Sequence, residues 1–374
     1  MRCCVLRAAC CVLLVLAACG RAEAPALPAE NAMVADDVDL DNAGGANLLS
    51  LARGASVISR TAEQTLESSA AHAIDGDWLT SWRSSPGGPE QTLVFSLAAR
   101  ARVDRVGIIA PQDAEAPSQV RFDASDDGVT WREIKTLSIK PQRAPQLVNV
   151  PPFEAQYLRV QTAGGGPYTS IRSVLAKGTE VAPPRQPPIE GCWRINGTPA
   201  RFSRRGTSVS GVIGSDPPMY VLGGTDGRAI RLTWLRSAMW GPAIVTLDPQ
   251  RRALSGERWH EAVREQNSGD GWFGTPLECG SDAAAFESGG FAAAVQNETE
   301  IAAAMLKRAG SWTAYGDSAL DTLAALIARA PGQRFEIVVR TAAQRDRLRA
   351  RGINTPITVA AAKGIVDGVE LHAR

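Results

Sequence analysis

The most chemically suggestive residues of this chain lie in one short stretch, AHAIDGDWLTSW, at residues 71–82. Asp75 and Asp77 flank a glycine, and Thr80 follows, so a single turn could present carboxylate and hydroxyl oxygens together. Metal ions such as calcium bind several hard oxygen ligands, so this turn raises the question of a metal site. The same side chains could instead shape the turn by hydrogen bonding to its backbone, and the sequence leaves both interpretations open.

Two neighbouring carboxylates also raise the question of glycoside hydrolysis. That chemistry needs one carboxyl buried with a raised pKa while the other stays ionised, and nothing in the turn indicates such a difference. The chain contains no Gly-x-Ser-x-Gly elbow, no Walker loop and no His-Glu-x-x-His motif, and it has only 3 histidines. The sequence therefore favours a binding protein over an enzyme.

The first twenty residues predict export and lipidation. Arg2 and Arg7 precede the apolar run CCVLLVLAAC, which is too short to span a bilayer securely. Residues 16–19, Leu-Ala-Ala-Cys, resemble the lipobox of bacterial lipoproteins. This resemblance implies that residues 1–18 are a removed signal peptide and that Cys19 carries the lipid. Gly20 is not the aspartate that commonly retains such proteins at the inner membrane, so the resemblance implies a lipid-anchored protein of the outer membrane.

Cysteine content and charge restrict the partners further. Of the 7 cysteines, only Cys192 and Cys279 lie beyond the lipobox, and an even pair in an oxidising compartment predicts a disulfide. The net charge is +1 and no basic stripe is present, so nucleic acid is not an expected partner.

Composition divides the exported chain into parts, and the predicted fold class is multidomain and mainly β. Residues 19–46 form the lipidated N-terminus and a flexible tether rich in Ala, Pro and Asp. Residues 47–178 alternate apolar and polar side chains between turn residues, which predicts an antiparallel β-sandwich. Prolines at 179–188 predict a stiff extended linker.

Two further parts follow the linker. Residues 189–281 predict a second, small β module that the disulfide closes, with hairpin signals at GTDGR and DPQRR. Its opening, GCWRI, is similar to the Gly-x-Trp start of lipocalins, but the segment is short for a barrel that holds a ligand. Residues 282–374 alternate helical and strand patterns and predict an α/β domain.

Five motifs in the first β part follow one another in a recognisable order: NLLSLARGASV, AIDGDWLTSW, QTLVFSLAARARVDRVGI, VRFDASDDGVTWREI and FEAQYLRVQT. Together they resemble a discoidin domain, also called a coagulation factor 5/8 type C domain, which is the jelly-roll sandwich of family 32 carbohydrate-binding modules. The resemblance implies a structural calcium at Asp75, Asp77 and Thr80, with Trp82 packed beneath the loops. The family usually supplies a late glutamate before its final strand, where this chain has Ser173.

The same resemblance implies that loops at one end of the sandwich bind the ligand. Sugar-binding members stack an aromatic ring on the sugar and hydrogen-bond its hydroxyl groups. The candidates in this chain are His72, Trp78, Arg83 and Tyr168.

The last part contains the run YGDSALDTLAALIARAPGQRFEIVVRT, which is similar to OmpA-like peptidoglycan-associated domains. Those domains place a His-Thr-Asp motif after the strand, and this chain has none there. The resemblance therefore describes a degenerate domain to which no binding residues are assigned.

Three functions are compatible with these parts. The favoured one is an outer-membrane lipoprotein that binds carbohydrate without catalysis, either peptidoglycan or an external polysaccharide, through its discoidin-like domain. The first alternative is a structural protein whose modules bind other envelope proteins. The second is an auxiliary subunit of a carbohydrate-active enzyme.

Overall fold

The computed structural model describes residues 45–374 except 78, 89, 238, 261–268, 281–298, 301, 304–305, 308–309, 316, 340 and 360–367. The predicted signal peptide, Cys19 and most of the tether lie outside these residues. No helix within the described ranges combines the length and the apolar character needed to cross a membrane.

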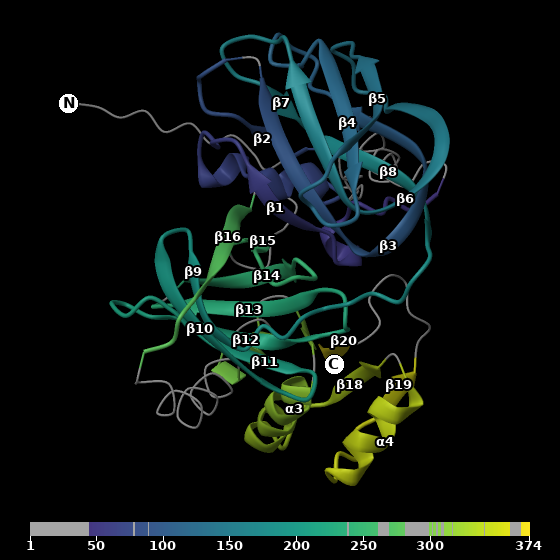
Figure 1. The fold of residues 1–374 in the computed structure, drawn as a ribbon. Helices are drawn as coiled ribbons and strands as arrows, with labels where there is room; N and C mark the ends of the chain where they lie inside the picture. The colour runs from purple at the N-terminus through teal and green to yellow at the C-terminus, as the bar shows by residue number, and fades with distance from the viewer. Residues whose placement is uncertain are drawn as a thin grey trace, which may run out of the picture. The chain divides into compact units, whose positions relative to one another are not determined.

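The first part is an antiparallel β-sandwich (Figure 1). Its larger sheet runs in the order β1-β3-β6-β4-β5, with β8 also pairing with β3, and β2 pairs with β7 in a second, small sheet. The strands are β1 (Ser56–Arg60), β2 (Trp82–Arg83), β3 (Gln91–Ile109), β4 (Gln119–Ser125), β5 (Arg132–Ser138), β6 (Gln146–Ala163), β7 (Ser170–Ile171) and β8 (Ser173–Glu180). The sandwich predicted for residues 47–178 is therefore confirmed.

Strands β3 and β6 are each twice as long as the sequence pattern predicts. The pattern divides each of them into two short strands, whereas the structure continues through the division and shifts the register between Ser96 and Ala101. Such an irregularity bends a strand without ending it, so one strand can serve both halves of the sandwich. The core contains the fully buried rings of Trp82, Phe95 and Phe122. Trp82 is thus the core residue that the sequence predicts.

Three short 3₁₀ helices close the sandwich between its early strands: η2 (Leu51–Arg53), η3 (Leu66–Ser68) and η4 (Ala70–Ile74). Every residue of η4 is buried, including His72. Ser69 caps η4, because its hydroxyl accepts a hydrogen bond from the Ala71 amide at 3.3 Å. The acidic turn predicted around Asp75 begins directly after η4.

The second part is a closed eight-stranded barrel in which each strand pairs with its neighbours in the chain and β16 returns to β9. Its strands are β9 (Gly191–Ile195), β10 (Thr198–Arg205), β11 (Ser208–Ile213), β12 (Met219–Thr225), β13 (Ile230–Arg236), β14 (Met239–Leu247), β15 (Leu254–Arg258) and β16 (Asp270–Leu277). Both predicted hairpins are present, as the β12–β13 and β14–β15 turns.

Side chains fill the barrel interior. Residues of alternating position face inward on each strand, and Trp193, Phe202, Trp234 and Trp272 are among the buried cluster that they form. Gly223 lets neighbouring strands approach closely, because a Cβ there would lie 1.9 Å from the Arg231 carbonyl oxygen. The sequence does not predict closure into a barrel.

The predicted disulfide between Cys192 and Cys279 is present and joins the two ends of the barrel over 87 residues. Cys192 begins the first barrel strand and Cys279 follows the last one, which pair with each other. The crosslink therefore fastens the strands whose pairing closes the barrel.

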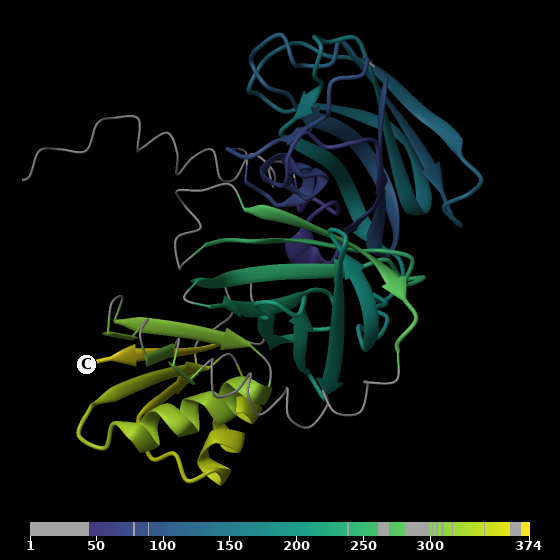
Figure 2. The ribbon, with the colours of Figure 1, turned by 90° about the vertical axis from the view of Figure 1, so that its left-hand side faces the viewer.

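The third part is a small α/β domain with the strand order β17-β20-β18-β19. It contains β17 (Ser311–Tyr315), α3 (Asp317–Arg329), β18 (Phe335–Val339), α4 (Ala342–Ala350), β19 (Ile357–Val359) and β20 (Gly368–Ala373). Figure 2 shows α3 and α4 on the same side of this sheet. Elements α3, β18, α4 and β19 confirm the sequence prediction, whereas β17 and β20 are not predicted. The run ETEIAAAMLKRAG at 298–310 also has helical periodicity, and its residues 299, 300, 302, 303, 306 and 307 are helical in the structure.

The proline-rich linker does not hold the sandwich and the barrel apart. Strand β8 runs on to Glu180, and beyond it the Arg185 amide donates to the Ala98 carbonyl oxygen at 3.1 Å. Gln186 then donates to the Arg228 carbonyl oxygen of the barrel at 3.3 Å. The expectation of a spacer is corrected, because the barrel packs directly against the sandwich and the linker lies along both.

Candidate functional site

Two of the predicted ligand-binding residues lie together at one end of the sandwich. The Arg83 guanidinium carbon lies 4.1 Å from the centre of the Tyr168 ring, in a cation–π contact. Both side chains are partly exposed. The sequence names these residues separately, and the fold brings them together because β2, which carries Arg83, pairs with β7, whose first residue follows Tyr168 by two positions.

Loops on either side hold this pair in place. The Ser170 amide donates to the Glu115 carbonyl oxygen at 2.9 Å, and the Gly166 amide donates to the Ala114 carbonyl oxygen at 2.9 Å. Gly164 has a φ of +70°, a left-handed conformation that favours glycine in the turn after β6. The β3–β4 and β6–β7 loops are therefore joined by backbone hydrogen bonds, which fixes the Tyr168 backbone.

Glu115 and Gln64 complete the cluster, and sequence reasoning did not identify either. Arg83 forms an ion pair with the Glu115 carboxylate and donates to the Gln64 side-chain oxygen at 2.8 Å. Glu115 belongs to the loop that follows β3, and Gln64 precedes η3. No local motif marks these two residues, because they approach Arg83 only through the pairing of distant segments. We call Gln64, Arg83, Glu115 and Tyr168 the loop-end cluster.

The structure removes His72 from the ligand-binding candidates. Its side chain is completely buried, and its Nε2 lies 2.8 Å from the Gly269 carbonyl oxygen and 3.4 Å from Glu257 Oε1, both in the barrel. Its Nδ1 lies 3.4 Å from the Ser81 carbonyl oxygen. A ligand at the loop end cannot reach a ring that the barrel covers. Trp78, the fourth candidate, lies outside the described residues.

The acidic turn is built by the hydrogen bonds of its own side chains. Asp75 accepts from the Asp77 amide at 2.8 Å and from the Thr80 hydroxyl at 2.7 Å, and Asp77 accepts from the Leu79 amide at 2.9 Å. Burial raises the pKa of Asp75 well above its usual value of 3.8, and the nearby Glu257 carboxylate raises it further.

These contacts bear directly on the calcium prediction. Both Asp75 oxygens accept hydrogen bonds within the turn. In the described part of the chain, no group of three or more His, Cys, Asp or Glu residues is placed to hold a metal ion. Two carboxylates, a hydroxyl and backbone carbonyl oxygens do not form such a group, so calcium binding at Asp75, Asp77 and Thr80 stays a prediction.

The comparison with protein families addresses the sandwich. Residues 55–174 match the family model of the F5/8 type C domain. The sandwich is an F5/8 type C domain. This match lies inside the range 47–178 that the sequence motifs predict.

Three solved structures are similar to part of this chain. One is the C-terminal domain of a chitobiase from Bacteroides fragilis, with 24% identity, a TM-score of 0.32, and coverage of 34% of this chain and 96% of that chain. Another is a family 32 carbohydrate-binding module from Clostridium perfringens in complex with GalNAc-β-1,3-galactose, with 17% identity, a TM-score of 0.31, and coverage of 35% and 99%. A third is the family 32 module of NanJ from Clostridium perfringens in complex with galactose, with 18% identity, a TM-score of 0.32, and coverage of 35% and 97%. The search of curated proteins gave no match.

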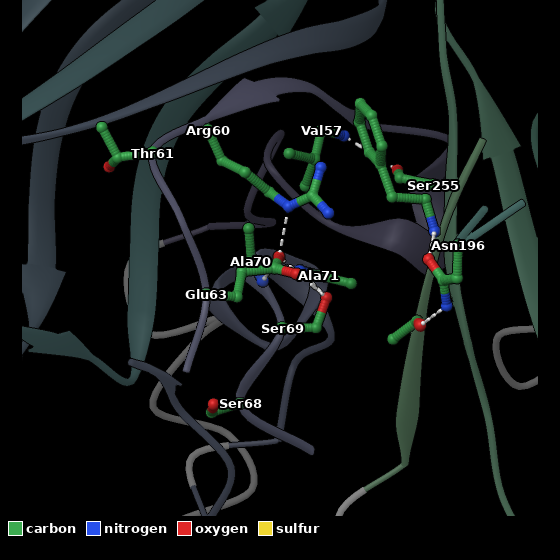
Figure 3. A network of polar contacts seen from close by, with 12 residues as sticks. Val57, Arg60, Thr61, Glu63, Ser68, Ser69, Ala70, Ala71, Asn196 and Ser255 are labelled. Atoms are coloured by element: carbon green, nitrogen blue, oxygen red, sulfur yellow. Dashed lines mark hydrogen bonds and ion pairs between the residues drawn. The ribbon is translucent and has the colours of Figure 1, made fainter. Parts of the chain in front are cut away.

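Polar contacts join the F5/8 type C domain to the barrel (Figure 3). The Ser255 hydroxyl accepts from the Val57 amide at 2.8 Å, and Arg60, which is ion-paired with Glu63, packs over the Phe273 ring at 3.9 Å. Gly271 leaves room for the domain, because a Cβ there would lie 2.0 Å from the Ser69 side chain. The two parts therefore pack so closely at Gly271 that no side chain fits there.

Two ionic contacts extend this interface. Arg228 of the barrel donates two hydrogen bonds of 2.6 Å to the Glu180 carboxylate, which lowers the pKa of Glu180. Arg252 of the barrel lies 4.8 Å from the centre of the Tyr157 ring, and burial beside Asp248 raises the pKa of Tyr157 to about 12. The barrel therefore covers the side of the F5/8 type C domain that carries His72, and the loop-end cluster remains the candidate binding site.

Proposed function

We propose that this protein binds carbohydrate without catalysis, through the loop-end cluster of its F5/8 type C domain. The observation that carries the proposal is the cation–π contact of Arg83 with Tyr168, at 4.1 Å, beside the acceptor oxygens of Glu115 and Gln64. A sugar offers an apolar ring face and several hydroxyl groups, and the cluster provides an aromatic ring and charged or amide partners for them.

A carboxylate held by an arginine suits hydroxyl recognition. Glu115 keeps unused lone pairs after pairing with Arg83, since an ionised carboxylate has about four acceptor positions. Arg83 in turn has five N–H donors and uses its two terminal nitrogens for Glu115 and Gln64. The pairing therefore orients Glu115 toward a ligand at little additional ordering cost.

A hydrolytic role would require an accessible acid pair. The described residues do contain two buried carboxyl groups next to His72, Asp75 with a raised pKa and Glu257. Glu257 and His72 are completely buried between the F5/8 type C domain and the barrel, so a polysaccharide has no route to them. This cluster supports a structural role, and binding at the loop end remains the proposed activity.

The subcellular localisation of the protein is part of the same proposal. The lipobox-like residues 16–19 support an outer-membrane lipoprotein anchored through Cys19, with peptidoglycan or an external polysaccharide within reach. Cys19→Ser should abolish the incorporation of labelled palmitate. Labelling of the variant at the wild-type level would refute the anchor.

Pull-down with sacculi and soluble polysaccharides, followed by calorimetry with the ligand that binds, tests the binding proposal. Tyr168→Ala and Glu115→Gln should each weaken binding by roughly 1–2 kcal/mol, as expected for a stacked ring or a charge-assisted hydrogen bond. Arg132→Ala is the matched control, because Arg132 also packs over an aromatic ring, Phe153, at 5.9 Å, but belongs to β5. Unchanged affinity in both cluster variants would move the site elsewhere. Capture of envelope proteins without any glycan would favour the alternative of a structural protein.

A further inference from the structure

A cavity lies at one mouth of the barrel, and none of its lining residues belongs to the loop-end cluster. Its volume is about 540 Å³, which is within the range of small-ligand sites. The β9–β10 turn, the β11–β12 connection and the ends of β13, β15 and β16 surround it, and Leu66 of η3 contributes from the F5/8 type C domain. The barrel interior below is filled by side chains, so a ligand would sit at the mouth.

The cavity has an apolar floor and a polar wall. Ile195, Ile213, Met219 and Trp272 are buried and form the floor, whereas the turns above them expose Thr198, Ser215 and Asp216. A pyranose ring also has an apolar and a polar part, namely a face of C–H groups and a rim of hydroxyl groups. The wall offers both hydroxyl and carboxylate partners for that rim.

Two arginines line this cavity, and their surroundings differ. Arg258 is neutralised by Asp270, to which it donates at 2.7 and 3.1 Å, and it packs over the Trp234 ring at 4.9 Å. Arg236, at the end of β13, is partly buried and forms no ion pair or hydrogen bond with any residue that the structure describes. Among the residues that the structure describes, no acceptor occupies the planar fork of donors that Arg236 brings to this cavity.

The charges around Arg236 favour a singly charged carboxylate over a doubly charged phosphate as the ligand. A guanidinium binds carboxylate and phosphate in a bidentate manner. The exposed Asp216 carboxylate on the same wall would repel a dianionic phosphate more strongly than a singly charged carboxylate, while it can accept hydrogen bonds from hydroxyl groups. We infer that the barrel mouth is a binding site for a carboxylated sugar, with the carboxylate on Arg236 and the ring over the apolar floor. This site does not depend on the function proposed for the loop-end cluster.

The test uses the purified full-length protein with glucuronate as the probe, and glucose and inorganic phosphate as comparisons, in ligand-observed NMR titrations. Glucuronate should bind the wild type more tightly than either comparison. Arg236→Gln should weaken glucuronate binding at least tenfold, as expected for a lost charge-assisted contact. Arg194→Gln on β9, an exposed arginine outside the cavity, should leave it unchanged.

A conservative variant keeps the inference testable if Arg236→Gln proves unstable in thermal denaturation. Arg236→Lys retains the charge but loses the planar fork, and it should bind glucuronate several-fold more weakly than the wild type. Glucose or phosphate binding as tightly as glucuronate would overturn the inference, and so would wild-type affinity in the Arg236 variants. Loss of glucuronate binding in Tyr168→Ala but not in Arg236→Gln would assign the sugar to the loop-end cluster instead, and would also overturn it.

Discussion

The buried contact between His72 and Glu257 makes a testable prediction about what holds the F5/8 type C domain to the barrel. Nε2 of His72 lies 3.4 Å from Glu257 Oε1, and both side chains have 0% exposure. We consider the substitution Glu257→Gln, which keeps the size of the side chain. Weakening a buried polar contact commonly costs about 1–3 kcal/mol, because the remaining polar group is left buried without its partner.

One feature of the structure places the expected loss at the lower end of that range. A glutamine oxygen could still accept a hydrogen bond from His72. We therefore expect the free energy of unfolding to fall by about 1–2 kcal/mol at neutral pH.

Glu154→Gln is the matched control for this experiment. Glu154 pairs with Arg100 at 3.0 Å, but the two side chains are 48% and 46% exposed, and exposed pairs contribute about 0–1 kcal/mol. Denaturant unfolding of both variants, together with hydrogen exchange in η4 and β15, measures the difference. Equal stability of Glu257→Gln and Glu154→Gln, with both proteins folded, would refute the view that this pair holds the interface.

Three further predictions concern stability. Cys279→Ser should lower the free energy of unfolding by about 4–5 kcal/mol in the chain-entropy account, because the disulfide spans 87 residues, and an unchanged melting temperature would contradict this. Trp82→Ala should cost about 3–5 kcal/mol, since the ring is fully buried, and retention of the wild-type near-ultraviolet circular dichroism would argue against it. The raised pKa of Asp75 means that the folded protein holds a proton which the unfolded chain has lost, so stability should fall as pH rises above about 3.8. The fall should be at most about 1.4 kcal/mol per pH unit and should be absent in Asp75→Asn, as pH-dependent denaturation can establish.

The sequence predicts those features that depend on local pattern. The alternation of apolar residues gives the strands of the sandwich, and paired turn signals give the two barrel hairpins. Trp82 is predicted as core because a family motif fixes its place beneath the loops. Cys192 and Cys279 are paired because no other cysteine follows the lipobox.

Features that depend on long-range closure are not predicted. The barrel closes because β16 pairs with β9, whose residues are about eighty positions apart, and periodicity contains no information on that pairing. The same reasoning applies to β20, which completes the α/β sheet between β17 and β18. Glu115 joins Arg83 for a similar reason, since the β3–β4 loop reaches the end of β2 only in the folded sandwich.

His72 shows why residue type alone misplaces a candidate. A histidine before an acidic turn suits ligand binding in an isolated sandwich, but here the barrel packs over η4 and provides Gly269 and Glu257 as its partners. The error follows from treating the linker as a spacer. Once the linker lies along both parts, the surface that carries His72 becomes an interface.

The hydrogen bonds of the acidic turn indicate whether Asp75 has a structural role or binds a metal ion. The Thr80 oxygen lies 2.7 Å from Asp75 Oδ2 and 2.8 Å from the Asp77 carbonyl oxygen, yet a hydroxyl group has a single proton to donate. Burial and the Glu257 carboxylate raise the pKa of Asp75 by more than the shared Thr80 hydrogen bond lowers it. Asn at this position is neutral and keeps an acceptor for the Asp77 amide, while Thr80 can still donate to the Asp77 carbonyl oxygen. Asp75→Asn should therefore fold normally and be at least as stable as the wild type at neutral pH. If Asp75 were instead a calcium ligand, Asp75→Asn would remove its charge and abolish any calcium-dependent rise in melting temperature. Titration of both proteins with calcium chloride therefore distinguishes the neutral carboxyl of a structural turn from a metal site.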